Sequence, residues 1–278
     1  MYFCRGKQFR TAFKCLRDLA AYFPTSPRLA LSATVTVEME KEIIKALGMK
    51  KPTVIKENPD RPNVFLSKMQ KELGEDVYQT YENIYKPLVD DLKQKKNLFP
   101  VTLIYIPLQY MGNAISYCIH VFKNSNLQNC MYGALCSGQD ETVKQTILTD
   151  LRKKCPRIRL IFCTAVVGMG FNSPSIERVV HTKPPHSLTD FVQEFGRSGR
   201  AGQPAISILY YCNHDIASNI TGMKQDIVGY CREDKCLREY LLKQFGFEKT
   251  NSYINHDCCN YCKVHCSCFE CAILRIEL

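Results

Sequence analysis

Short apolar runs alternate with amphipathic segments between residues 103 and 211, and this alternation constrains the fold more than any other feature of the chain. Apolar, β-branched runs predict strands, whereas apolar residues that recur every three or four positions predict helices. We expect strands at 103–106, 130–132, 158–163, 178–180 and 206–211, and helices at 110–122, 141–151 and 188–195. Because such alternation is typical of parallel sheets covered on both faces, the sequence predicts a doubly wound α/β domain.

Two regions flank this domain. An apolar run at Arg28–Leu31 predicts a buried strand that enters the turn Ser32-Ala33-Thr34, and Gly48 is placed to end the next helix. Helices are expected in the flanks at 9–22, 37–47, 216–230 and 237–245. A polar stretch that begins at Lys68 and a change of pattern after Cys212 set the boundaries, which gives domains at 1–67, 68–213 and 214–278.

The chain has 278 residues and carries 37 Lys and Arg against 27 Asp and Glu, a formal net charge of +10 at pH 7. A basic surplus favours a polyanionic partner, either a nucleic acid or an anionic membrane. No stretch approaches the apolar length of a membrane span, and the first residues lack the apolar core of a signal peptide. We therefore expect an intracellular protein without a membrane partner.

The 16 cysteines are unevenly distributed, and a group of them crowds near the C-terminus. This group comprises Cys258, Cys259, Cys262, Cys266, Cys268 and Cys271. Small secreted domains use such clusters for disulfides, whereas larger chains without a secretion signal use them for metal. We expect a metal site, with a disulfide-bonded tail as the alternative.

A glycine-rich loop with two arginines follows the helix expected at 188–195. Ser187 is placed to cap the start of this helix and Gly196 to end it. Arg197 and Arg200 then emerge three residues apart, and two guanidinium groups held on such a loop can grip phosphate oxygens. The alternative is a solvated basic loop after an ordinary helix.

A second glycine-containing turn, Thr164 to Pro174, lies at the C-terminal end of an expected strand, where doubly wound sheets place their ligands. Gly168 and Gly170 would permit backbone contact with a phosphate, although a plain strand-to-helix turn is the alternative.

Together these two segments resemble motifs V and VI of superfamily 2 helicases in their RecQ form. The Ser32-Ala33-Thr34 turn resembles motif III, Leu103–Pro107 resembles motif IV, and Asp60–Asn63 resembles the segment that joins the two motor lobes. Because these motifs appear in the family's order across nearly the whole chain, it is identified as the rear portion of a RecQ-like ATP-dependent DNA helicase. The resemblance implies a RecA-like second lobe, preceded by part of a RecA-like first lobe and followed by a small helical zinc-binding module.

The resemblance also implies a role for each matching residue. Arg200 would be the arginine finger on the γ-phosphate of ATP, Arg197 its phosphate-binding companion, and Gln193 the coupler of nucleotide state to lobe closure. Asn172 and Gly170 would lie near the nucleotide, and the intact family enzyme would use ATP with Mg²⁺. The remaining motif residues would contact the DNA backbone or link hydrolysis to DNA movement: Thr164, Gly168, Ser32 and Thr34.

The zinc module of RecQ helicases takes its first ligand from the start of a helix that ends near Phe-Gly. Here Cys236 opens such a helix and Phe245-Gly246 closes it. Cys259 and Cys262 form a C-x-x-C pair suited to tetrahedral Zn²⁺, and Cys266 is our choice for the fourth ligand of one structural ion. The choice stays open at several positions: Cys268 or His265 in place of Cys266, and Cys258 in place of Cys259, with Cys231 and His256 expected to be bystanders.

Part of the family's catalytic machinery does not occur in these 278 residues. They contain no G-x-x-x-x-G-K-[ST] phosphate loop and no Asp-Glu-x-His box, which belong upstream of the Ser32-Ala33-Thr34 turn. Tyr132-Gly133 also replaces a frequent Tyr-His, which puts one DNA contact in doubt. We expect a monomeric 3′–5′ DNA helicase of repair or recombination that acts on single-stranded or forked DNA in the nucleus or cytoplasm, inactive as this chain alone. The alternatives are a non-catalytic zinc- and DNA-binding protein, or an RNA helicase of the same superfamily.

Overall fold

A computed structural model describes residues 18, 22–23, 25–124, 126, 129–165, 173–249 and 255–271. The chain divides into two compact units, one of residues 1–60 with 239–249, the other of residues 61–238 with 250–278. Within the described part of the chain, no helix is both long and apolar enough to cross a membrane.

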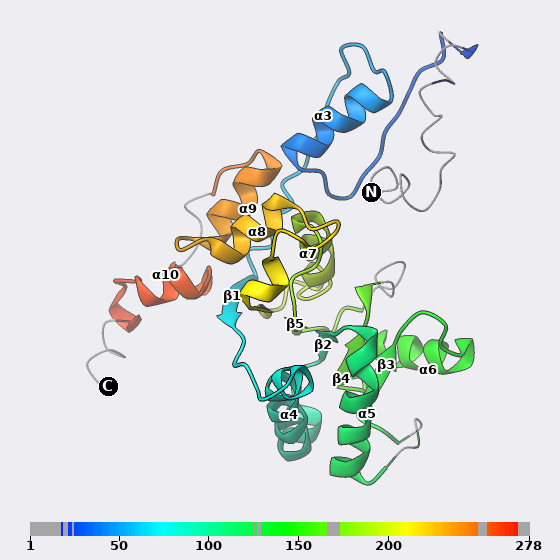
Figure 1. The fold of residues 1–278 in the computed structure, drawn as a ribbon, viewed down its shortest axis with the longest axis vertical. Coiled ribbons are helices and arrows are strands. Elements are labelled where there is room, and N and C mark those ends of the chain that lie inside the picture. The colour runs from blue at the N-terminus through cyan, green and yellow to red at the C-terminus, as the bar shows by residue number, and fades with distance from the viewer. Residues whose placement is uncertain are drawn as a thin grey trace. The chain divides into compact units, whose positions relative to one another are not determined.

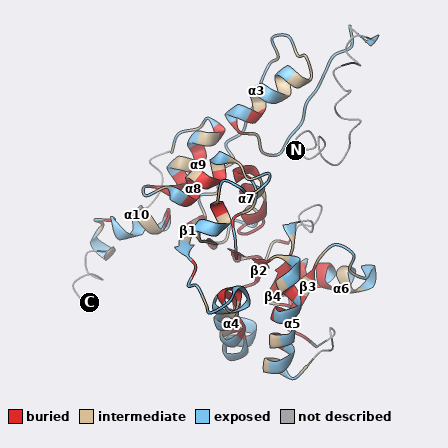
Figure 2. Ribbon diagram, in the orientation of Figure 1, coloured by how far each residue is buried: buried red, intermediate tan, exposed pale blue. Residues whose placement is uncertain are grey.

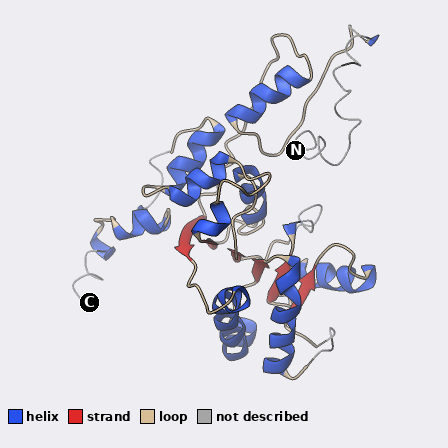
Figure 3. Ribbon diagram, viewed as in Figure 1, coloured by secondary structure: helices blue, strands red, loops and turns tan. Residues whose placement is uncertain are grey.

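The second unit is built on a six-stranded sheet in the order β1-β6-β5-β2-β4-β3, in which every neighbouring pair is parallel (Figures 1 and 3). The strands are β1 Val64–Gln70, β2 Thr102–Tyr105, β3 Tyr132–Leu135, β4 Leu160–Cys163, β5 Arg178–His181 and β6 Ala205–Tyr211. The predicted doubly wound parallel sheet is therefore confirmed.

Helices cover both faces of this sheet. They are α4 Val77–Lys95, α5 Leu108–Phe122, α6 Glu141–Leu151, α7 Leu188–Phe195 and α8 Gln225–Arg232. The short helix α10 Asn260–Val264 lies beside β1, and most of α9 Leu237–Phe245 belongs to the first unit. Apolar side chains of α4 and α5 pack on the face that carries Ile104, Phe162 and Val180. The opposite face carries His181, whose ring meets that of Phe191 on α7. Figure 2 shows the buried residues concentrated in the strands and the inner helix faces.

The strand β1 lies where the sequence predicted a boundary between domains. All seven residues of Val64–Gln70 pair in register with β6, so the strand belongs to the sheet and the second unit begins at Arg61. The strand was hard to predict because Ser67, Lys68 and Gln70 interrupt the apolar pattern, as polar residues can on an edge strand. The long helix α4 likewise forms in a stretch for which no element was predicted.

The helix expected at 216–230 forms only in its second half. A 3₁₀ turn at Asn213–Ile216 is followed by loop up to Gln225, where α8 begins. Gly222 has φ +82°, which an α-helix does not accommodate, and it separates the two segments.

The first unit contains α3 Val37–Ala46, capped by the Thr36 hydroxyl and ended by Gly48 at φ +58°, as predicted. The strand predicted at Arg28–Leu31 does not form. Leu31 there is 82% exposed, and no described strand pairs with the segment. A strand needs a partner for its backbone groups, which explains the difference. The helix expected at 9–22 lies outside the described residues, apart from Asp18 and Tyr22.

Candidate nucleotide and metal sites

The carboxyl edge of the sheet presents polar and titratable side chains at the ends of three strands. Tyr105 ends β2, Cys163 ends β4 and His181 ends β5. Helix α7 starts beyond this edge, where the Ser187 hydroxyl accepts the Asp190 N–H at 3.1 Å and caps the helix. The predicted cap and the predicted end at Gly196 are both present, and the chain that leaves α7 bonds to Ile176 and Asn63, which lie just before β5 and β1.

The loop after α7, residues 196–203, is called the arginine loop here. The Asn63 side chain donates to the carbonyls of Gly199 and Gln203, at 2.8 and 2.7 Å. The Gly199 N–H donates to the Ile176 carbonyl at 2.9 Å. Gly199 has φ +63°, and a Cβ at this position would lie 2.4 Å from the Asn63 amide nitrogen. The loop is therefore fixed in a shape that glycine permits.

Three guanidinium groups gather at this loop. Arg61 donates to the Gly196 carbonyl at 2.9 Å, and Arg200 Nε donates to the same oxygen at 3.3 Å. Burial lowers the pKa of the Arg200 guanidinium, and the charges of Arg197 and Arg61 lower it further. Mutual repulsion of this kind is relieved by an anion bound among the three groups. Arg61 was not predicted as a site residue, although it stands in the Asp60–Asn63 segment that carried part of the resemblance.

Arg197 is anchored from the interior, with only 6% of the residue exposed. Burial raises the pKa of the Tyr105 hydroxyl well above its ordinary value, Cys163 and Glu194 add to the rise, and the hydrogen-bonded Arg197 guanidinium opposes it. His181 stacks on Tyr105 and contacts Glu194, with Nε2 and Oε2 3.0 Å apart. The end of α7 is thus tied to the sheet by a buried polar network that orients Arg197.

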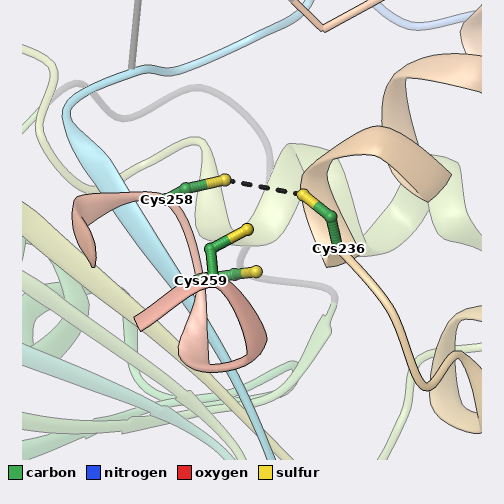
Figure 4. A group of neighbouring side chains, drawn as sticks. Cys236, Cys258 and Cys259 are labelled. Carbon is green, nitrogen blue, oxygen red and sulfur yellow. Dashed lines mark hydrogen bonds between the residues drawn. The ribbon is translucent and has the colours of Figure 1, made fainter. Parts of the chain in front are cut away.

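A cluster of four cysteines lies beside β1. The sulfurs of Cys236, Cys258, Cys259 and Cys262 all lie within 4.8 Å of one another. The Cys236 and Cys258 sulfurs are 3.6 Å apart and point toward each other (Figure 4). Because tetrahedral Zn²⁺ with bonds of about 2.3 Å places its sulfur ligands about 3.8 Å apart, the cluster fits this ion.

The cluster differs from the predicted ligand set at one position. Cys236, Cys259 and Cys262 come together as expected, but the fourth sulfur belongs to Cys258 and not to Cys266. From the sequence, Cys258 and Cys259 were alternatives for one ligand position. In the structure, the turn before α10 directs both side chains into the cluster. Cys266 lies beyond the end of α10 with His256, Cys268 and Cys271.

Backbone contacts attach the cluster to the outer edge of β1. The Leu66 N–H donates to the Cys258 carbonyl at 3.2 Å, and Leu66 forms a parallel bridge with Cys259. The buried Arg238 guanidinium donates to the carbonyls of Arg61 at 3.0 Å and Cys258 at 3.3 Å. The cysteine cluster therefore covers a strand edge that would otherwise expose unpaired backbone groups.

Comparison with known proteins agrees with these features. Residues 88–202 match the family described as the helicase conserved C-terminal domain. ATP-dependent DNA helicase Q-like 2 of Arabidopsis thaliana is 26% identical over 260 residues, which cover 87% of this chain and 34% of the relative. ATP-dependent DNA helicase RecQ of Haemophilus influenzae is 25% identical over 278 residues, which cover 91% of this chain and 40% of the relative. The chain is similar to RecQ-type DNA helicases over most of its length. It spans less than half the length of either protein.

Solved helicase structures share the fold of this RecQ-like chain. Yeast Dbp5 bound to RNA and ADP BeF3 superposes with a TM-score of 0.52 at 14% identity, covering 82% of this chain and 52% of that chain. Mycobacterium smegmatis Lhr bound to ssDNA and AMP-PNP gives a TM-score of 0.53 at 19% identity, covering 73% and 27%. These identities establish a RecA-like helicase fold and nothing finer.

The other RecQ-like motif residues are placed as follows. Gln193 is half-buried on α7, one turn before Arg197. Thr164 follows β4 directly, and its N–H donates to the Leu135 carbonyl at 3.2 Å. Ser32 and Thr34 lie in the first unit, where the Ser32 hydroxyl donates to the Thr34 carbonyl at 3.1 Å. The remaining predicted residues lie outside the described part of the chain: Gly168, Gly170 and Asn172.

Proposed function

We propose that the second unit is the second motor lobe of an ATP-dependent 3′–5′ DNA helicase, and that Arg197 and Arg200 act on the γ-phosphate of ATP. The gathering of Arg61, Arg197 and Arg200 at one glycine loop carries this proposal, because burial and then the charges of Arg197 and Arg61 lower the pKa of Arg200, and a bound anion relieves this repulsion. Dbp5 and Lhr share the fold and were solved with nucleotide analogues, which supports nucleotide binding by this lobe.

The proposal assigns this chain one half of an ATP site. Arg200 would stabilise charge that develops on the transferring phosphate, Arg197 would hold a phosphate oxygen, and Gln193 would report the nucleotide state. Asn172 and Gly170 would lie close to the nucleotide. Cradling the β-phosphate and holding Mg²⁺ requires a phosphate loop and an acidic box, and neither sequence occurs in these 278 residues. The chain alone should therefore hydrolyse ATP no faster than background.

The proposed partner is single-stranded or forked DNA, reached through the backbone-contacting motifs. Thr164 and Gly168 would contact phosphates, while Ser32 and Thr34 would couple hydrolysis to movement along the strand. Phosphate contacts are insensitive to sequence and weaken steeply with salt. A chromosomal substrate implies action in the nucleus of a eukaryotic cell.

We also propose one structural Zn²⁺ at Cys236, Cys258, Cys259 and Cys262. The matching sulfur separations support it, as does the position of the cluster on the β1 edge. Such an ion supplies folding free energy and takes no part in hydrolysis.

Phosphate release with single-stranded DNA tests the nucleotide proposal in two arrangements. The chain alone should give background turnover, and robust DNA-stimulated turnover would contradict the half-site assignment. The first motor lobe of Haemophilus influenzae RecQ, fused ahead of residue 61, should restore turnover, and Arg200→Ala should lower it by ~10³-fold. Arg152→Ala is the matched control because Arg152 is an exposed arginine at the end of α6.

A second candidate is a zinc- and DNA-binding protein without catalysis, which the lack of a phosphate loop in these residues favours. The same fusion separates the two candidates. A fusion that binds DNA with the usual salt dependence, yet gives turnover indifferent to Arg200, would favour the non-catalytic protein.

A further inference from the structure

A second group of metal-ligand side chains lies just beyond α10, separate from the four-cysteine cluster. It comprises His256, Cys266, Cys268 and Cys271, whose ligand atoms all lie within 4.8 Å of one another. The two groups share no residue, so the second group is not an alternative set of ligands drawn from the first. The group uses Cys266 and Cys268, which were weighed for the first ion, and His256, which was expected to be a bystander.

We propose that these four residues bind a second structural Zn²⁺ as a Cys₃His site. Tetrahedral zinc places a histidine nitrogen and a cysteine sulfur about 3.6 Å apart. The His256 Nδ1 lies 3.2 Å from the Cys268 sulfur and 3.7 Å from the Cys266 sulfur, on either side of this value. Cys₃His is an established donor set of closed zinc sites, and the C-x-C-x-x-C spacing supplies three ligands from one turn of chain.

The orientation of His256 gives independent support. Its Nδ1 faces the sulfurs, while its Nε2 lies 3.7 Å from a carboxylate oxygen of both Asp257 and Glu270. Metal-bound histidines commonly direct their second nitrogen toward a carboxylate, and His256 has this general arrangement at ion-pair distance, longer than a hydrogen bond.

The surroundings argue against a packing role for these cysteines. Cys266 is buried, yet its neighbours Val264 and Phe269 are 68% and 79% exposed, so the turn has no apolar core of its own. No disulfide occurs among the described cysteines. A second ion would hold the chain on the far side of α10, whose near end is held by Cys259 and Cys262 in the first cluster.

Zinc content of the full chain, purified without added metal and dialysed against a weak chelator, tests the proposal. We expect two ions per chain, falling to one in Cys271→Ser and in His256→Ala, while the exposed and distant Cys155→Ser keeps two. Cys271→His should restore the second ion because imidazole replaces the thiolate. X-ray absorption of the unaltered chain should give seven sulfurs and one nitrogen for the two ions together.

The same measurements distinguish this proposal from the first zinc site. One ion per chain that is lost in Cys262→Ser and kept in Cys271→Ser would overturn the second site and leave the first intact. Two ions that survive both Cys271→Ser and His256→Ala would overturn the assigned ligands. An oxidised Cys266–Cys271 or Cys268–Cys271 pair, found by mass spectrometry without reductant, would show a disulfide in place of the metal. The double variant Cys262→Ser with Cys271→Ser should bind no zinc, and this result would support both assigned sites.

Discussion

The arginine loop and the cysteine tail, residues 255–271, are both attached to the second unit, but different forces hold them. The loop is held by hydrogen bonds from the Asn63 side chain and from the Gly199 N–H. It follows helix α7, whose apolar face is buried. Among residues 256–271, whose burial is described, only three cysteines are buried: Cys258, Cys259 and Cys266. A segment that buries so little apolar surface lacks the usual source of folding free energy and needs a staple. We therefore predict that removing the metal unfolds the tail but not the sheet, and that weakening the core destabilises the sheet but does not release the metal.

The largest expected effect is the loss of the tail on removing its metal. Cys259→Ser, or a strong chelator, should unfold residues 255–271 while the sheet keeps its structure, because structural zinc contributes about 10–16 kcal/mol at pH 7. Hydrogen exchange should show fast exchange in the tail and unchanged protection in β2, β4 and β5. Cys155→Ser is the control. A tail that stays protected without metal would remove the distinction between the two regions.

The second effect probes the core beneath the arginine loop. Glu194→Ala leaves the buried His181 Nε2 without its hydrogen-bond partner, and leaving one buried polar group unsatisfied costs about 1–3 kcal/mol. Urea unfolding of the sheet measures this cost, and zinc content should not change. Glu141→Ala, which breaks an exposed pair with Lys144, should cost less than about 1 kcal/mol. Equal losses in the two variants would mean that the buried network does not anchor α7.

A third substitution tests the shape of the loop itself. Gly199→Ala places a Cβ against Asn63 at φ +63°, so we expect a loss of about 1–2 kcal/mol. Gly112 lies inside α5 with open space around it, and Gly112→Ala should instead stabilise the chain by up to about 1 kcal/mol. Thermal unfolding of the two variants should therefore shift in opposite directions. A neutral Gly199→Ala would show that the loop tolerates another conformation.

The parallel sheet was predictable because its central strands are short, apolar runs that carry their own signal. The edges were not. Arg28–Leu31 has the more apolar pattern yet is extended coil, whereas Val64–Gln70 contains Lys and Gln and forms β1. The difference lies in a partner: β6 supplies one to β1, and no described strand supplies one to Arg28–Leu31. Strand formation at an edge depends on tertiary pairing, which local pattern does not contain.

The site shows the same division. The arginines and the C-x-x-C pair could be predicted because each motif is contiguous in sequence. Arg61 and Asn63 reach the arginine loop from about 135 positions upstream, and spacing gives no sign of such a contact. Adjacent Cys258 and Cys259 looked like alternatives because side chains alternate along an extended chain, whereas the turn into α10 brings both sulfurs to one side.

The smallest effect separates the two regions by their response to acid. Asp150 at the end of α6 accepts the Ile158 N–H at 2.8 Å and pairs with Lys153, also at 2.8 Å. Burial raises the pKa of the Asp150 carboxyl, but these bonds outweigh it, and the pKa in the folded chain is below its ordinary value. The stability it confers is therefore present above the unfolded-state pKa of about 3.9 and is lost as the pH falls through the folded-state value.

Asp150→Asn should consequently cost about 1 kcal/mol at pH 7, and the difference from the unaltered chain should shrink below pH of about 4. The cysteine tail should respond earlier in the same titration, because thiolates must take up protons as zinc leaves, and this occurs at higher pH than carboxylate protonation. Circular dichroism followed together with released zinc records both events. We expect zinc release to precede the loss of helix, with Asp150→Asn moving only the second event. If one transition carries both signals, the metal-held tail and the core-held loop unfold as a single cooperative unit.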